Sequence, residues 1–177
     1  MPSTPLTRRA VLILVPGAAL GACTSSRDAP VSRAAPVSRA TGPARGYYPN
    51  ETPPLRRLIR RYADRYDVPM DLVQRVIVRE STHRPHARNG PYMGLMQIHP
   101  NTARGMGYDG PPEGLLDAET NLRYAVKYLR GAWLVSDGDM DEAVMWYARG
   151  YYYEAKKRCQ LVETGLLNRE IAKHCRA

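Results

Sequence analysis

The sequence of 177 residues lacks three kinds of segment. The apolar stretch Val11–Val15 is too short to span a bilayer, and no other candidate for a membrane helix follows it. No alternation of apolar and polar residues extends beyond a few positions, which argues against a protein built on β-sheets. No basic run is interleaved with aromatic residues, which argues against a nucleic-acid partner.

The net charge of +9 is unevenly distributed along the chain. Residues 1–50 hold six Arg and one Asp, whereas residues 51–177 hold twenty Lys and Arg against sixteen Asp and Glu. The larger part of the chain is therefore only mildly basic. A mildly basic domain behind a basic N-terminal segment suits an anionic polymer surface such as the cell wall.

The first residues have the layout of an export signal. Arg8 and Arg9 precede the apolar stretch, and small residues follow up to Cys23. The position of Cys23, directly after Leu-Gly-Ala, resembles the lipobox of bacterial lipoproteins, in which the signal is removed before a cysteine that carries lipid. We therefore expect a signal peptide at 1–22 and a membrane anchor at Cys23, and the alternative is an ordinary signal with a chance cysteine. Because Thr24 and Ser25 carry no aspartate-type retention signal, the expected location is the periplasm, at the outer membrane.

Residues 23–50 are rich in Ser, Ala, Pro, Gly and Arg, and the sequence of residues 29–34 is repeated at 35–40. So few large apolar side chains predict a disordered linker, lipidated at Cys23 if the lipobox resemblance holds, which leaves 51–177 as one folded domain. Cys159 and Cys175 then remain as an even pair in an oxidising compartment. We expect a disulfide between them, and the alternative is two buried free thiols.

Helical periodicity dominates the folded part and predicts an all-α domain. Apolar residues recur at helical spacing over 55–66, 69–77, 119–133 and 141–149, and one or two more helices are expected between 152 and 174. Residues 84–116 contain six Gly and five Pro and are expected to be a loop. A long irregular segment inside a compact helical domain is usually functional.

Glu80 continues the apolar stripe of the second expected helix. It follows Val73 by seven positions, so its carboxylate points to the same side as Val73 and Val76. Burial raises the pKa of a carboxyl group, and a glutamate that stays protonated near neutrality can act as the general acid in the cleavage of a glycosidic bond. From the helix alone, the alternative is a glutamate that turns to solvent or pairs with Arg79 or Arg84.

The residues around and after Glu80 carry a resemblance to a known family. The motifs are Glu80-Ser81, Asn89-Gly90, Gly94-Leu95-Met96-Gln97-Ile98, Pro100, Thr102-Ala103 and, further on, 117–129 and 146–150. Together they resemble the catalytic domain of lytic transglycosylases of the soluble-lytic-transglycosylase type, related to goose-type lysozyme, over roughly residues 66–155. The resemblance implies a lysozyme-like helical domain with a loop-rich glycan cleft, acting on the glycan strands of peptidoglycan.

The resemblance also implies a role for each matching residue. Glu80 corresponds to the single catalytic acid and base, and Ser81 to the serine that holds the carboxylate or the sugar. The segment that lines the glycan cleft corresponds to Gly94, Leu95, Met96 and Gln97. Tyr147 corresponds to the aromatic residue near the acid, and the next family tyrosine is one of Tyr151, Tyr152 and Tyr153. Ala148 stands where the family usually has asparagine, so one sugar contact is missing or comes from elsewhere.

A second carboxylate of the kind that hydrolytic glycosidases use is not evident, because no acidic residue lies between Glu80 and Asp109. The resemblance implies a reaction with one carboxylate, in which Glu80 protonates the bond between N-acetylmuramic acid and N-acetylglucosamine and the C6 hydroxyl of the muramic acid attacks C1. The product is a 1,6-anhydro end, and no cofactor is expected. The alternatives are a lysozyme-like hydrolase and a wall-binding protein that has lost activity, with Ala148 as the trace of that loss.

A metal site is not expected. Glu80 and His83 have the spacing of half a di-iron site, but no second Glu-x-x-His occurs. His83 and His86 flank Pro85, so they cannot share a helix face. We expect His83 and His99 to lie on the loop surface.

Overall fold

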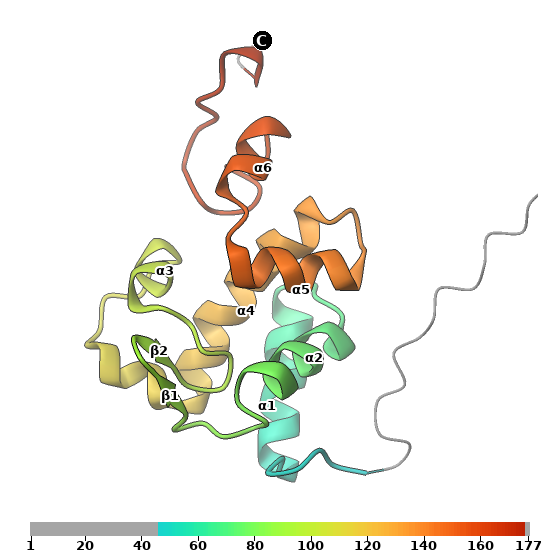
Figure 1. Cartoon of the computed structure of the whole chain (residues 1–177), viewed down its shortest axis with the longest axis vertical. Coiled ribbons are helices and arrows are strands. Elements are labelled where there is room, and N and C mark those ends of the chain that lie inside the picture. Colours follow the sequence, from blue (N-terminus) through green and yellow to red (C-terminus); the bar gives the residue numbers. More distant parts are fainter. Residues whose placement is uncertain (1–45, 176–177) are drawn as a thin grey trace, which may run out of the picture. The chain divides into compact units, whose positions relative to one another are not determined.

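The computed structural model describes residues 46–175 (Figure 1). The expected signal peptide at 1–22, Cys23 and most of the expected linker at 23–50 lie outside the described residues and stay predictions. The described elements follow in the order α1 (Pro53–Arg65), α2 (Met70–Glu80), β1 (Arg88–Asn89), β2 (Tyr92–Met93), α3 (Pro100–Gly105), η1 (Pro112–Leu116), α4 (Ala118–Val135), α5 (Met140–Arg149), α6 (Tyr152–Lys157) and η2 (Lys173–Cys175), where η marks a 3-10 helix.

The predicted all-α fold is confirmed, and the helices α1, α4 and α5 each begin at a side chain that caps them. Thr52 accepts a hydrogen bond from the N–H of Leu55 at 3.3 Å, and Pro53 and Pro54 occupy the first turn of α1. Asp117 and Asp139 accept in the same way from the third residue beyond them, each at 2.8 Å, and so begin α4 and α5. These caps satisfy backbone N–H groups that have no partner inside a helix.

Two regions differ from the helices expected from the sequence. The loop expected at 84–116 contains α3, η1 and a small antiparallel sheet, in which Arg88 pairs with Met93 and Asn89 with Tyr92. The stretch 152–174 forms only the six-residue α6 and part of η2, with turns between them. These elements are too short for a hydrophobic period to reveal.

α4 is the central element of the helical domain. α1 and α2 lie on one side of it, α3, η1 and the small sheet lie on the other, and α5 crosses near its end (Figure 1). Leu122, Val126 and Leu129 on α4 are completely buried, as are Ile59 on α1 and Ile77 on α2. Burial of each such side chain contributes on the order of 2 kcal/mol, so this core fixes the position at which α2 ends.

Residues 46–51 contact the helical domain, so the predicted boundary at 51 falls inside a stretch that is packed. The guanidinium of Arg56 lies 4.2 Å from the centre of the Tyr47 ring and donates to the backbone oxygen of Gly46 at 2.8 Å. The ring of Tyr48 stacks on that of His83 with centroids 5.1 Å apart. No helix between residues 46 and 175 combines the length and the apolarity that crossing a membrane requires.

Candidate active site

Glu80 is the last residue of α2, three positions after the buried Ile77. Its side chain is 24% exposed, and its Oε1 lies 3.6 Å from Nε of the more exposed Arg79. Burial raises the pKa of the Glu80 carboxyl group above its ordinary value, and the charge of Arg79 opposes this without cancelling it. Arg84, the other cation expected near it, donates to the backbone oxygen of Ser81 instead.

Ser81 ties the end of α2 to the Gly94–Gln97 segment. Its hydroxyl donates to the backbone oxygen of Leu95 at 2.7 Å, and its N–H donates to Ile77 at 3.0 Å. The side chain is buried, with 2% of the residue exposed. The serine therefore fixes the distance between the carboxylate and the segment opposite it.

Gly94 is required by the packing of the Gly94–Gln97 segment. Its φ is +80°, and a Cβ at this position would lie 2.1 Å from Nδ2 of Asn121 and 2.3 Å from the backbone oxygen of Leu115. The space left by the missing side chain is filled by these two residues. The reason for glycine here is thus the close approach of α4 and η1.

Asn121 is a site residue that the sequence reasoning missed. It is completely buried on α4, and its Nδ2 donates to the backbone oxygens of Met93 and Leu115, each at 2.8 Å. Its Oδ1 accepts from the N–H of Met96 at 3.0 Å. The signal available in the sequence was a lone amide on the stripe that continues through Ala125 and Leu129.

The other residues of the Gly94–Gln97 segment differ in what they present to solvent. The side chains of Leu95 and Met96 are completely buried, so they belong to the core. Gln97 is 8% exposed, and its Nε2 donates to the backbone oxygens of Ala87 and Gly94 at 3.0 and 2.9 Å. Of the four residues expected to line a glycan cleft, Gln97 is the one whose side chain borders the groove described next.

A groove of about 240 Å³ lies between the loop region and the end of α5. Its lining includes Gln97 and Ile98, His99 and Thr102, and Tyr92 and Tyr128, and on the α5 side Tyr147, Ala148, Arg149 and Gly150. Several of these residues, among them Tyr92, His99 and Tyr128, were not expected in a cleft. None of the described residues that line the groove is acidic.

Tyr147 lines the groove and lies close enough to Glu80 to interact with it electrostatically. Its hydroxyl donates to the backbone oxygen of Met96 at 2.9 Å, and its ring packs edge-on against Tyr128 with centroids 5.5 Å apart. Burial raises the pKa of the Tyr147 phenol well above its ordinary value, and the charge of Glu80 adds to this. The phenol therefore stays protonated, and Glu80 lies close enough to act on it electrostatically.

The three consecutive tyrosines after α5 separate in space. Tyr151 is 1% exposed, its hydroxyl donates to the backbone oxygen of Tyr128 at 2.9 Å, and it packs against Gly131, where a Cβ would lie 2.2 Å from that hydroxyl oxygen. Tyr152 and Tyr153 are 38% and 82% exposed. Tyr151 is thus a core residue, and none of the three lines the groove.

A buried polar network supports the turn that follows Glu80. Glu51 accepts from Arg56 and from Nε2 of Gln74 at 2.7 Å, and Oε1 of Gln74 lies 2.6 Å from Nε2 of His83. Since the Gln74 amide nitrogen donates to Glu51, its oxygen accepts from His83. Asn50 also contacts this turn, donating to the backbone oxygen of Thr82 at 2.9 Å.

The expectation that His83 lies on the surface is wrong. The residue is 1% exposed, and Thr82 and His83 both have positive φ, +51° and +60°, which turns the chain sharply and brings the imidazole back against α2. Burial lowers the pKa of His83, so the imidazole is held neutral. Periodicity could not predict this, because the burial depends on a turn made by two residues in the left-handed region.

The comparison with protein families decides what kind of domain holds this arrangement. The model of the transglycosylase SLT domain matches residues 57–160, which is more than half of the chain. The chain belongs to the SLT transglycosylase family. No solved structure matched the chain. The SLT match includes Glu80, the Gly94–Gln97 segment and Tyr147, and it identifies a lysozyme-like domain of the type that acts on peptidoglycan.

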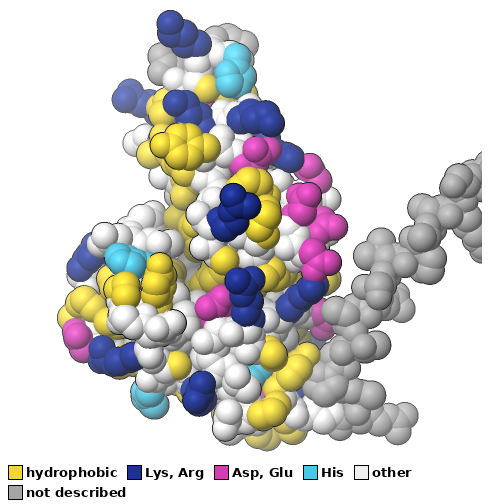
Figure 2. All heavy atoms as spheres, viewed as in Figure 1, with side chains coloured by type: hydrophobic (Ala, Val, Ile, Leu, Met, Phe, Trp, Pro, Cys, Tyr) yellow, Lys and Arg dark blue, Asp and Glu magenta, His cyan; other side chains and the backbone are white. Residues whose placement is uncertain are grey.

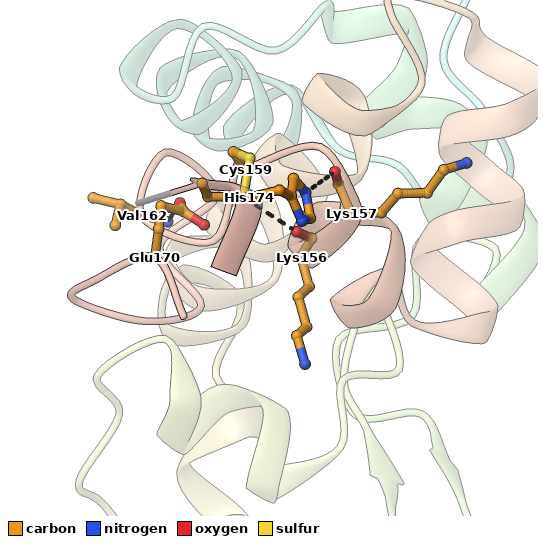
Figure 3. The surroundings of a disulfide bond; sticks show 7 residues. Lys156, Lys157, Cys159, Val162, Glu170 and His174 are labelled. Carbon is orange, nitrogen blue, oxygen red and sulfur yellow. Dashed lines mark hydrogen bonds between the residues drawn. A yellow bond between two sulfur atoms is a disulfide. The ribbon is translucent and has the colours of Figure 1, made fainter. Parts of the chain in front are cut away.

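Among residues 46–175 one group of potential metal donors occurs, at the C-terminal end. One ligand atom each of Cys159, His174 and Cys175 lies within 4.8 Å of the others. Cys159 and Cys175, the pair expected from the sequence, are joined by a disulfide with Cα atoms 5.4 Å apart (Figure 3). Because both sulfur atoms are used in the disulfide, they are not available as thiolate ligands.

Proposed function

We propose that this SLT domain is a lytic transglycosylase that cleaves the β-1,4 bond between N-acetylmuramic acid and N-acetylglucosamine without water, with Glu80 as its single acid and base. The observation that carries the proposal is the isolation of Glu80. Its side chain is three-quarters buried and the pKa of its carboxyl group is raised, and among the described residues Arg79 is the one charged group that contributes to the shift. No described residue that lines the neighbouring groove offers a second carboxylate.

In the proposed reaction, Glu80 first donates its proton to the glycosidic oxygen as the bond to C1 breaks. The oxygen leaves as the 4-hydroxyl of N-acetylglucosamine. The C6 hydroxyl of the same muramic acid then attacks C1, and the Glu80 carboxylate accepts the proton of that hydroxyl. Glu80 returns to its protonated form, and the products together have the composition of the substrate, one of them ending in a 1,6-anhydro ring.

The raised pKa of Glu80 supports both proton transfers. Cleavage requires a protonated carboxyl group near neutrality, and the second step requires a carboxylate basic enough to take a proton back. Tyr147, held by Met96 beside Glu80, supplies a neutral hydroxyl and no further charge. A single carboxyl group whose pKa is raised above its ordinary value can donate the proton in the first step and accept one in the second.

Glycan binding is proposed along the groove. Gln97 and Ala148 border it from opposite sides, and Tyr92, 46% exposed, offers a ring face on which a sugar can pack. Ala148 is exposed and supplies no hydrogen bond from its side chain. The contact made by the family's asparagine is therefore absent, unless the neighbouring Arg149 replaces it.

The test compares Glu80→Gln with the parent protein on purified peptidoglycan sacculi. The amide is nearly isosteric but cannot donate or accept the proton, so release of soluble muropeptides should fall by roughly 10²- to 10⁴-fold. Glu113→Gln, at an exposed position on η1, is the matched control and should leave the rate unchanged. Near-normal release by Glu80→Gln would remove Glu80 from its proposed role.

Two other functions give different results in the same assay. A lysozyme-like hydrolase would release products with a reducing end, each heavier by one water than the anhydro product. A wall-binding protein without activity would sediment with sacculi and release nothing. No second carboxylate occurs among the described residues that line the groove, which argues against the hydrolase, and the retained Glu80, Ser81 and Gln97 argue against the inactive protein.

We also propose that the protein reaches the periplasm and is held at the outer membrane by lipid on Cys23. The proposal rests on the sequence Leu-Gly-Ala before that cysteine. Cys23→Ser should prevent incorporation of radiolabelled palmitate and move the protein from the membrane fraction to the periplasmic fraction. Palmitate incorporation that persists in Cys23→Ser would contradict the lipid assignment.

A further inference from the structure

A second pocket lies between α6 and the segment before the C-terminal disulfide. It measures about 530 Å³, and its lining includes Tyr153, Lys156 and Lys157 from α6 and Lys173 and His174 from η2. We refer to it as the cationic pocket. Lys and Arg side chains gather over this part of the molecule, next to exposed hydrophobic side chains (Figure 2). None of its described lining residues is acidic.

The disulfide holds the two walls of the cationic pocket together. Cys159 follows α6 by two residues and is bonded to Cys175 at the end of η2. His174 also bonds α6, with its Nε2 3.0 Å from the backbone oxygen of Lys157. Figure 3 shows this imidazole between the disulfide and α6, while the side chains of Lys156 and Lys157 extend away from the disulfide.

The positive charges of the cationic pocket are poorly neutralised. The ammonium groups of Lys156 and Lys173 have no ion-pair or hydrogen-bond partner among residues 46–175. The carboxylate nearest to Lys157 is that of Glu154, at 3.9 Å, and Glu154 is also bonded at 2.6 Å to Arg158. Arg158 in turn bonds Asp137 at 2.6 Å. Glu154 and Asp137 are thus bound to Arg158, and Glu170 accepts from the N–H of Val162 at 2.8 Å, so Lys156 and Lys173 are left to bind an anion.

The position of the cationic pocket relates it to the groove. Gly150 lines the groove and Tyr153 lines the pocket, and three residues span at most about 11 Å even when fully extended. The ring of Tyr153 is 82% exposed and packs edge-on against Tyr152 with centroids 5.3 Å apart. The exposed ring of Tyr153 and the cationic pocket beside it therefore lie near the end of the groove that Gly150 lines.

We propose that the cationic pocket binds a free carboxylate of the peptide branches that peptidoglycan glycan strands carry. This inference rests on the proposed function, because that function brings such a strand into the groove. Lysine ammonium groups bind carboxylates as point charges that adjust to a flexible partner, and the Tyr153 ring offers apolar contact to a peptide. The pocket would make the enzyme prefer glycan that still bears its peptides.

The test is the double variant Lys156→Gln/Lys173→Gln, with cleavage measured on two substrates. One is glycan with its peptides, and the other is glycan stripped of peptides by an amidase. The variant should raise KM for the peptide-bearing glycan about tenfold, the effect of losing one or two charge-assisted contacts, and leave kcat and KM for stripped glycan unchanged. Added salt should reduce the difference, because the pocket is open to solvent.

A matched control removes the same charge elsewhere. Arg57→Gln/Arg60→Gln lies on the exposed face of α1 and should change neither substrate's kinetics. An equal rise in KM on both glycans, or the same rise in the control, would show a general electrostatic effect and overturn the proposal. An unchanged KM on both glycans would overturn it as well.

A binding measurement separates this proposal from the proposed function. The parent protein should bind a short acidic peptide more tightly than the same peptide with amidated carboxylates, and the double variant should lose that preference. This result can be obtained even if neither glycan is cleaved, in which case the proposed function fails and the pocket assignment stands. Stronger competition by inorganic phosphate than by the acidic peptide, or binding to anionic phospholipid vesicles alone, would overturn the carboxylate assignment.

Discussion

Replacing Glu51 with glutamine tests the network that supports the turn after Glu80. The Glu51 side chain is completely buried and accepts hydrogen bonds from Arg56, from the backbone of Tyr48 and from Gln74. Burial alone would raise the pKa of Glu51, but these bonds outweigh it and lower the pKa from 4.5 to about 2. A difference of this size corresponds to about 3 kcal/mol of stability at neutral pH.

The sign of this effect gives the prediction its pH dependence. A carboxyl group with a lowered pKa in the folded state stabilises the fold above its ordinary pKa, and the stabilisation is lost as pH falls from 4.5 toward 2. Glu51→Gln should therefore lower the free energy of unfolding by about 3 kcal/mol at pH 7. Near pH 2, where Glu51 is about half protonated in the folded parent and almost fully protonated in the unfolded chain, the free energies of unfolding of the two proteins should differ much less.

The assay is urea unfolding followed by far-UV circular dichroism at pH 7, 4.5, 3 and 2. Glu163→Gln, at an exposed position, is the control and should match the parent throughout. If the free energies of unfolding of Glu51→Gln and the parent differ by the same amount from pH 7 to pH 2, the electrostatic reasoning is refuted. A difference below about 0.5 kcal/mol at pH 7 would show that the network contributes no more than a surface ion pair.

Three further predictions concern the site itself. Burial raises the pKa of Glu80, so the ionised carboxylate destabilises the fold increasingly as pH rises above the ordinary pKa of 4.5. Glu80→Gln should therefore raise the melting temperature at pH 7 but not at pH 4. An equal gain at both pH values would contradict this. Asn121→Ala should lower the urea-unfolding free energy by about 3 kcal/mol or more, because three buried backbone groups lose their partner, and a loss under 1 kcal/mol would be too small for that cause. Ala148→Asn should tighten glycan binding by about 0.5–1.5 kcal/mol in a sacculus pull-down without changing the product, whereas loss of activity would mean that the groove is specialised around the alanine.

The long helices and the position of Glu80 could be predicted because they depend on local features. The spacing of Val73, Val76 and Glu80 is a property of one helix, and Thr52 and Asp117 act as caps within a few residues. The roles of Ser81 and Gln97 came from the family resemblance, and their hydrogen-bond partners came from the structure. In both residues the polar side chain bonds backbone oxygens of the Gly94–Gln97 region.

The residues that were missed depend on contacts between distant parts of the chain. Asn121 meets Met93 across 28 positions, and His83 is buried because Tyr48 and Gln74 close over it. Sequence reasoning could not choose among the three consecutive tyrosines either. The choice of Tyr151 as the core residue depends on the space above Gly131 on a different helix.

The central claim, cleavage without water at a single carboxylate, is tested most directly by digesting sacculi in water labelled with oxygen-18 and measuring the products by mass spectrometry. Transfer of the C6 hydroxyl to C1 predicts muropeptides with a 1,6-anhydro end, each lighter by one water than the reducing form and free of the heavy oxygen. Products with a reducing end that carries oxygen-18 would show hydrolysis and contradict the account.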